Sequence, residues 1–209
     1  SGLTNTLVNA LAKKDSFIFA GTSGGVFRSS DAGTAWIAAS TGLSTLDIRA
    51  FAVVGSALFA GTLDGVFRST NNGTNWTSVD TILIIPFVQC FGVSGTTLFV
   101  GTPGGVLRST NNGTTWVATN TGLASTNVRA LAAIGTTIYA GTDTRGVYRS
   151  TNSGTNWTQA TSGMTDTLVY SLAVSGTNLI GGTDNNCFQS TNSGGTWTSI
   201  DVGLPNSNI

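Results

Sequence analysis

The sequence predicts an all-β fold, a five-bladed β-propeller with four antiparallel strands in each blade of about 40 residues. Two markers with the same period predict it. The five tryptophans recur every 40 or 41 residues, at positions 36, 76, 116, 157 and 197. A Gly-Thr pair recurs in parallel, at 21, 61, 101, 141 and 182. We therefore expect one domain over residues 1–209, with blades at about 1–41, 42–81, 82–121, 122–162 and 163–209.

Each repeat contains four short segments that are typical of strands. In the fourth repeat they are 127–133, 137–142, 146–151 and 157–160, rich in β-branched or aromatic residues and bounded by Gly, Asn, Ser or Thr. No segment has a sustained helical period of apolar residues. In the first repeat we expect strands at about 7–12, 16–21, 25–30 and 35–39. A single sheet of this size buries little, whereas radial packing gives each sheet two apolar neighbours.

Two rows of repeated residues are predicted to form the core between blades. They are Phe19, Phe59, Phe99 and Tyr139, and Phe27, Phe67, Leu107, Tyr148 and Phe188. An arginine follows the second row in four repeats, at Arg28, Arg68, Arg108 and Arg149, and is replaced by Gln189 in the fifth. Its repetition beside the tryptophan favours a packing or cation–π role over contact with a ligand.

The turn before each tryptophan reads Ser29-Ser-Asp31-Ala-Gly33-Thr-Ala-Trp36 in the first repeat and recurs in all five. This pattern resembles the Asp-box, or bacterial neuraminidase repeat, of sialidases and of photosystem II assembly-factor-like propellers. The resemblance implies a structural turn, in which Asp or Asn accepts backbone hydrogen bonds, Gly takes a positive φ and Trp covers the sheet edge. The matching residues are Asp31, Gly33, Trp36, Asn71, Gly73, Trp76, Asn111, Gly113, Trp116, Asn152, Gly154, Trp157, Asn192, Gly194 and Trp197.

Composition excludes several partners. Nine basic residues balance nine acidic ones, so no basic surplus attracts nucleic acid. No apolar run is long enough for membrane insertion. Only 9% of residues are charged, a composition typical of secreted or cell-surface proteins. Cys90 and Cys187 match no metal motif, and we expect them to be buried free thiols.

The sequence does not predict an enzyme. Glu and His are absent, so neither the Tyr/Glu pair that the sialidase resemblance implies nor a histidine-based triad or typical zinc site can form. We expect no cofactor and no metal. One catalytic alternative is a glycoside hydrolase in which two rim carboxylates about 5–9 Å apart act together. The candidates, otherwise solvated rim charges, are Asp47, Asp64, Asp80, Asp143, Asp166, Asp184 and Asp201.

One position near the start of the first strand of each repeat varies where its neighbours repeat. The residues there are Asn9, Arg49, Gln89, Arg129 and Tyr170. In a radial array they are expected near one mouth of the central channel. They could bind a small ligand, or they could line a water-filled channel.

The linker into the third repeat is apolar where the other linkers are polar. Its apolar residues, Ile82, Leu83, Ile84, Ile85 and Phe87, suggest contact with a protein partner or burial between blades. Residues 203–209 align with 42–48, so the chain is either a five-bladed ring with a tail or part of a longer, multidomain array.

These features favour a non-catalytic, secreted or cell-surface module that binds a protein or builds a larger structure. The alternative partner is a glycan, because five equivalent sites between blades would resemble a tachylectin-type lectin. Sugar sites usually need exposed aromatic residues, however, and the repeated aromatic residues are expected in the core.

Overall fold

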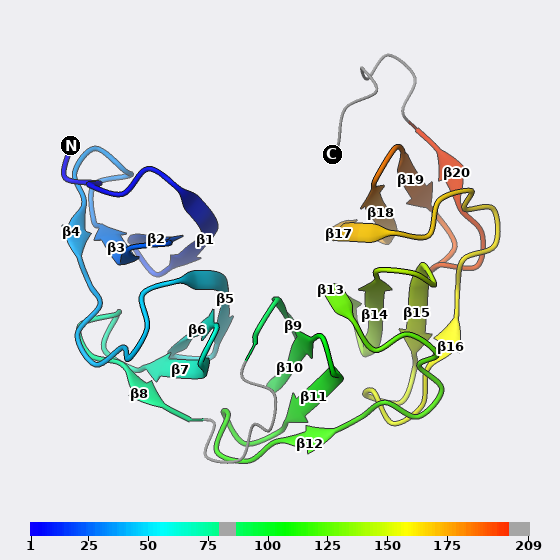
Figure 1. Ribbon diagram of the computed structural model, residues 1–209, viewed down its shortest axis with the longest axis horizontal. Helices are drawn as coiled ribbons and strands as arrows, with labels where there is room; N and C mark the ends of the chain where they lie inside the picture. The colour runs from blue at the N-terminus through cyan, green and yellow to red at the C-terminus, as the bar shows by residue number, and fades with distance from the viewer. Residues whose placement is uncertain (80–86, 201–209) are drawn as a thin grey trace. The chain divides into compact units, whose positions relative to one another are not determined.

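The computed structural model describes residues 1–79 and 87–200, which form 20 β-strands and no helix. The strands make five four-stranded sheets, one for each repeat, and in each sheet they pair in chain order (Figure 1). The resolved registers are antiparallel. This arrangement confirms the predicted fold class.

The strand bounds repeat closely from sheet to sheet. The first sheet comprises β1 (Val8–Lys14), β2 (Phe17–Thr22), β3 (Gly25–Ser29) and β4 (Ile37–Ala38), and the second comprises β5 (Ile48–Val54), β6 (Ala57–Thr62), β7 (Gly65–Ser69) and β8 (Thr77–Ser78). The third comprises β9 (Cys90–Ser94), β10 (Thr97–Thr102), β11 (Gly105–Ser109) and β12 (Val117–Ala118). The fourth comprises β13 (Val128–Ile134), β14 (Thr137–Thr142), β15 (Val147–Ser150) and β16 (Thr158–Gln159), and the fifth comprises β17 (Val169–Ser175), β18 (Asn178–Thr183), β19 (Cys187–Ser190) and β20 (Thr198–Ser199).

The outermost strand of each sheet is shorter than expected. In the first sheet it covers Ile37–Ala38 instead of 35–39, and its counterparts are also two residues long. Both residues of each of these strands are exposed. A two-residue edge offers few unpaired backbone groups to another chain, which limits edge-to-edge pairing.

The chain divides into two compact units. The first contains Ser1–Leu98 and Ser109–Trp116, and the second contains Phe99–Arg108 and the described part of Val117–Ile209. In both units the core lies where one repeat packs on the next. Phe19 of the first repeat shares a cluster with Ile48 and Trp76 of the second, and Tyr139 of the fourth shares one with Val169 and Trp197 of the fifth. The predicted first core row is fully buried at all four positions. In the second row only Leu107 is half-buried instead of buried.

Candidate binding surface

The turn before each tryptophan is closed by its own polar side chains. Ser69 Oγ donates to Asn71 Oδ1 and accepts a bond from the Gly73 amide, while Asn71 Oδ1 also accepts one from the Asn75 amide, each at 2.9 Å. Asp31 replaces the asparagine in the first repeat, and the Ala35 amide and the Ser29 hydroxyl that bond to it lower the pKa of its carboxyl group. Asp31 and Asn71 therefore accept the same two hydrogen bonds in equivalent turns, and the side-chain oxygen of each is used within its own turn.

The glycine of this turn takes the positive φ that the sequence predicted, and so does the residue before it. Asn72, for example, has φ 54° and Gly73 has φ 76°. The glycine also lies against the aromatic core row of the preceding repeat. A Cβ atom added to Gly73 would come within 3.0 Å of the Phe19 ring, and the same holds at 3.0–3.2 Å for Gly113 on Phe59, Gly154 on Phe99 and Gly194 on Tyr139.

Each tryptophan after the first reaches back to the preceding repeat. Its indole N–H donates to a backbone carbonyl just after that repeat's outermost strand. The bonds run from Trp76 to Ala39 at 2.8 Å, Trp116 to Val79 at 3.2 Å, Trp157 to Thr119 at 2.7 Å and Trp197 to Ala160 at 2.8 Å. Trp36 donates instead to Gly33 within its own turn. The tryptophans therefore join sheets as well as covering edges.

The repeated arginine reaches forward to the next repeat. Its Nη1 group donates to the carbonyl of the residue before the turn glycine. The bonds run from Arg28 to Asn72 at 2.6 Å, Arg68 to Asn112 at 3.3 Å, Arg108 to Ser153 at 2.8 Å and Arg149 to Ser193 at 3.3 Å. The Arg28 guanidinium also lies 4.9 Å from the centre of the Phe17 ring. These contacts agree with the predicted packing role.

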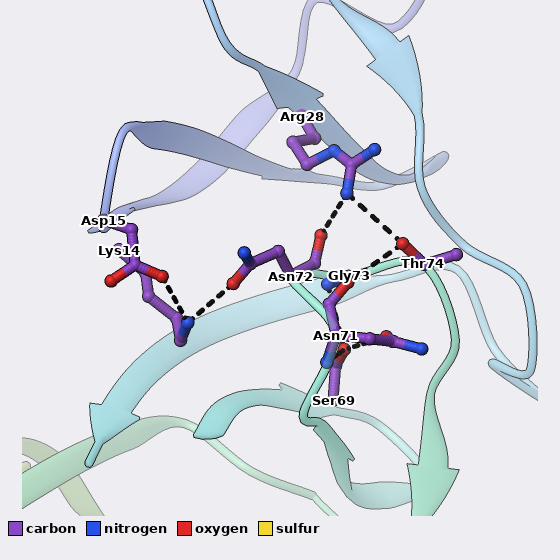
Figure 2. A network of polar contacts seen from close by, with 8 residues as sticks. All are labelled: Lys14, Asp15, Arg28, Ser69, Asn71, Asn72, Gly73 and Thr74. Carbon is purple, nitrogen blue, oxygen red and sulfur yellow. Dashed lines mark hydrogen bonds and ion pairs between the residues drawn. The ribbon is translucent and has the colours of Figure 1, made fainter. Parts of the chain in front are cut away.

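The first two repeats share one further connection, which Figure 2 shows. Lys14, whose side chain is only 7% exposed, places Nζ 2.6 Å from Asn72 Oδ1 and 2.7 Å from Asp15 Oδ2. Arg28 and Lys14 thus hold the same asparagine through its backbone and its side chain. The repeated residues of the turn and of the third strand are consequently engaged in holding neighbouring repeats together.

The variable position of the first strand lies at a β-bulge. The register shifts between Val8 and Ala10, and equivalent shifts enclose Arg49, Arg129 and Tyr170. A bulge leaves one residue out of the ladder and re-aims its side chain. The bulge residues Asn9, Arg49 and Tyr170 are exposed, and Arg129 is half-buried. Gln89 holds the aligned position in the third repeat and is also half-buried. We call these five residues the bulge row.

Within the first unit, members of the bulge row contact the next repeat. Asn9 Nδ2 donates to the Ile48 carbonyl at 3.0 Å and lies 3.4 Å from Asp47 Oδ1. Asp47 in turn forms a 2.8 Å ion pair with Arg49. The Arg49 guanidinium lies 5.8 Å from the centre of the Phe87 ring, which belongs to the third repeat and is 39% exposed.

Within the second unit the contact between arginine and ring recurs, and no described carboxylate forms an ion pair with the arginine. The Arg129 guanidinium lies 5.3 Å from the centre of the Tyr170 ring, which is 39% exposed. Tyr170 donates its hydroxyl to Asp184 at 3.4 Å. The bulge row therefore twice places an arginine from one repeat over an aromatic ring of the following repeat, a cation–π geometry.

Two of the candidate rim carboxylates, Asp143 and Asp166, accept several hydrogen bonds. Asp143 accepts bonds from Ser125 at 3.1 Å and Asn127 at 2.6 Å. Partial burial raises the pKa of Asp166. Hydrogen bonds from the Leu168 and Asn185 backbone amides and from the Asn185 side chain lower that pKa by more, so the net shift is downward. This is opposite to the raised pKa that a catalytic acid needs near neutral pH. Asp80 and Asp201 lie outside the described residues.

Among the described residues, no cluster of three or more acidic or cysteine side chains could hold a metal ion. Cys90 and Cys187 are both half-buried, whereas the sequence predicted buried thiols. Of the predicted apolar contact, only Phe87 is described; Ile82, Leu83, Ile84 and Ile85 lie outside the described residues. Within the described chain no helix has the length and hydropathy of a membrane span.

The five sheets, the shared turn and the contacts between repeats define a β-propeller repeat protein. A family model described as the DUF6242 beta propeller domain matches residues 90–209, which are 120 of the 209 residues. The chain therefore belongs to the DUF6242 β-propeller family. No curated protein matches it by sequence.

Solved structures with the same fold have diverse functions. The extracellular domain of a one-component system from B. thetaiotaomicron is 20% identical with a TM-score of 0.78, over 97% of this chain and 29% of that one. A GH74 xyloglucanase from Xanthomonas campestris is 18% identical with a TM-score of 0.74, over 96% and 38%. YCF48 bound to D1 peptide is 15% identical with a TM-score of 0.70, over 97% and 70%. The chain spans well under half of the first two, and these likenesses show the fold alone.

The sequence pointed to the variable residues but not to the features that group them. The bulge was missed because a register shift leaves no clear mark in an alternating strand pattern. The pairing of Arg49 with Phe87 and of Arg129 with Tyr170 was missed because each joins residues about 40 positions apart. The usable signal was the 40-residue period, which places these pairs in consecutive repeats at nearly the same position.

Proposed function

We propose that the chain is a non-catalytic binding module of a secreted or cell-surface protein. Its protein contacts are made by bulge-row residues in each unit, Asn9, Arg49 and Gln89 in the first and Arg129 and Tyr170 in the second. The observation that carries the proposal is that repeated and variable residues of the chain have different roles. The repeated side chains of the core rows and of the turn serve the packing of neighbouring repeats. Members of the bulge row also touch the next repeat, but the row varies from repeat to repeat, apart from Arg49 and Arg129, and three of its five residues are exposed. Binding residues are commonly carried on a rigid scaffold in this way.

The chemistry of the row suits a protein surface. Arginine and aromatic residues are enriched where proteins bind one another, because they combine apolar area with hydrogen-bond donors. YCF48, a propeller of the same fold, is solved with a bound peptide. Several neighbours in fold are extracellular domains of bacterial sensors, which supports a location outside the cell.

A selection from a phage-displayed peptide library on the immobilised chain tests this proposal. We expect enriched peptides to lose binding when Asn9, Arg49, Arg129 and Tyr170 are changed together to Ala. The control variant changes two exposed apolar residues of the outermost strands, Ile37→Thr and Val117→Thr, and should retain binding. Binding that survives the bulge variant, or no enrichment at all, would contradict the proposal.

A glycan is the second candidate partner, and one observation favours it. The Phe87 and Tyr170 rings are both partly exposed, and sugar-binding sites use such rings. The aromatic residues of the two core rows are buried, so these rows offer no repeated sugar-binding site. Saturable binding of one sugar class on a glycan array, lost in Tyr170→Ala, would replace the protein partner with a carbohydrate.

Catalysis by the rim carboxylates is the third candidate. GH74 enzymes share the fold, but the lowered pKa of Asp166 does not suit a catalytic acid, and the Asp143 carboxylate already accepts bonds from Ser125 and Asn127. We expect no release of reducing sugar from xyloglucan by the purified chain. Turnover that is lost in Asp166→Asn would overturn the non-catalytic assignment.

A further inference from the structure

Two arginines of the bulge row form a natural comparison, because they occupy the same position in different repeats. Arg49 in the second repeat and Arg129 in the fourth both lie at a bulge, and the guanidinium of each lies over a ring of the following repeat. They differ in the residue two positions earlier. It is Asp47 before Arg49 and Asn127 before Arg129.

This single exchange decides whether the chain supplies a carboxylate to the arginine. Asp47 forms the 2.8 Å ion pair with Arg49. Asn127 instead donates its side-chain amide to Asp143 at 2.6 Å, and the Asp143 carboxylate is also bonded to Ser125. Among residues 1–79 and 87–200, no carboxylate lies within ion-pair distance of Arg129.

Arg129 is also short of hydrogen bonds. Its Nε atom is shielded from solvent and has no hydrogen-bond partner in the described part of the chain. Arg68 and Arg149 have a similar Nε atom, but their Nη1 groups bond to the next turn, whereas Arg129 makes no such bond within the described ranges. A buried donor without a partner is costly, and each case in a folded protein calls for an explanation.

Contact with Tyr170 favours a planar acceptor for Arg129. The guanidinium lies 5.3 Å from the centre of that ring, and its hydrogen-bonding edge matches the two oxygens of a carboxylate. Asp143 and Asp184 add negative charge nearby, at the Asn127 amide and at the Tyr170 hydroxyl. Their field opposes any anion, but it opposes a multiply charged one such as phosphate more strongly than a singly charged carboxylate.

We infer that Arg129 and Tyr170 form a subsite for one carboxylate on an acidic side chain of a protein partner, which does for Arg129 what Asp47 does for Arg49. The inference rests on the proposed protein-binding function and specifies the chemistry of the contact. It also gives the Asp47/Asn127 difference a role in binding, because Arg49 already has a carboxylate partner and Arg129 has none among the described residues.

The subsite is tested with a blocked amino acid, so the outcome does not depend on finding the natural partner. N-acetyl-glutamate methylamide is titrated into the whole chain while NMR follows the Arg129 Nε–H signal and the Tyr170 ring. We expect saturable shifts at both. The blocked glutamine analogue and inorganic phosphate should each bind at least about tenfold more weakly, a difference of about 1.4 kcal/mol.

The matched variant exchanges the two side chains that differ in charge, Asn127→Asp together with Asp143→Asn. It keeps the net charge and allows the hydrogen bond between the two positions to persist, while it places a carboxylate where Asp47 stands in the second repeat. We expect binding of the blocked glutamate to fall about tenfold or more. Asp143→Asn alone should bind at least as tightly as the unaltered chain. Asp47→Asn should add a second responding site at Arg49.

The inference is overturned if the blocked glutamate gives no saturable shift, if the glutamine analogue binds equally well, or if the exchanged variant binds unchanged. Peptides selected by the bulge row that lack acidic residues would overturn the subsite alone and leave the proposed function standing. If the chain binds the blocked glutamate but no peptide, the proposed protein-binding function is overturned and the carboxylate subsite stands.

Discussion

At the scale of single residues, the turn glycine has two separate roles that the repeats allow to be told apart. Gly33 and Gly73 both have a positive φ, 91° and 76°. A Cβ atom on Gly33 would meet only its own Trp36 at 3.6 Å, an ordinary contact, whereas on Gly73 it would press on the buried Phe19 ring. Both positions therefore need the backbone freedom of glycine. Gly73 also needs to lack a side chain, because Phe19 occupies the adjacent space.

Substituting alanine at each glycine separates the two roles. Gly33→Ala should lower the free energy of unfolding by about 1–2 kcal/mol, the cost of a left-handed conformation. Gly73→Ala should lose about a further 1–3 kcal/mol, because the Phe19 ring must move in a packed core. Urea denaturation measures both. Equal losses would show that the contact with the preceding repeat is unimportant.

The lowered pKa of Asp31 leads us to expect that the free energy of unfolding decreases in acid. Hydrogen bonds to the carboxylate lower its pKa in the folded chain below the ordinary 3.8. Its stabilisation is therefore fully present above about pH 4 and is lost as the pH falls through the lowered folded value. Asp31→Asn, which copies the other four repeats, should flatten the acid limb of a stability–pH curve and leave neutral stability almost unchanged. A curve that keeps its full slope would assign acid sensitivity elsewhere.

At the scale of elements, the tryptophan and the arginine of the second, third and fourth repeats link sheets in opposite directions along the chain. The arginine of β7 bonds to the turn after β11, and the tryptophan after that turn bonds back to the residue after β8. Because both contacts involve the turn, that turn packs with the preceding repeat. This explains why Ser109–Trp116 belongs to the first compact unit although most of β11 belongs to the second.

Trp76→Phe tests the backward contact. It removes the N–H that bonds to the Ala39 carbonyl and leaves that buried group without its partner, which costs about 1–3 kcal/mol. Trp36→Phe removes a bond within one turn from a half-buried side chain and should cost less. Chemical denaturation of the two variants gives the comparison, and a larger loss for Trp36→Phe would contradict the assigned roles.

The sequence predicted the strands and the core more fully than the contacts between repeats and at the surface. The 40-residue period and the turn residues predicted five sheets, the buried Phe19 row and the positive φ of Gly73. They did not predict that Trp76 reaches Ala39 or that Arg28 reaches Asn72, because a repeat looks the same whether its side chains point within it or to its neighbour. Nor did they separate Arg49 from Arg129, since that difference lies in the geometry around Asp47 and Asn127.

At the scale of the whole molecule, the prediction that residues 1–209 form one domain rests on the third repeat. Its residues are divided between the two compact units, with β9 in the first and β12 in the second. We expect one calorimetric unfolding transition in which the van't Hoff and calorimetric enthalpies agree, because neither unit keeps a complete third sheet without the other. Two separable transitions would make the units independent domains.

The central claim is that repeated side chains hold neighbouring repeats together and so leave the bulge row for binding. Hydrogen exchange of the five indole N–H groups, followed by NMR, tests it most directly. The indoles of Trp76, Trp116, Trp157 and Trp197 bond to the preceding repeat and should exchange slowly, whereas that of Trp36 should exchange quickly. Uniformly fast exchange of all five would contradict the account.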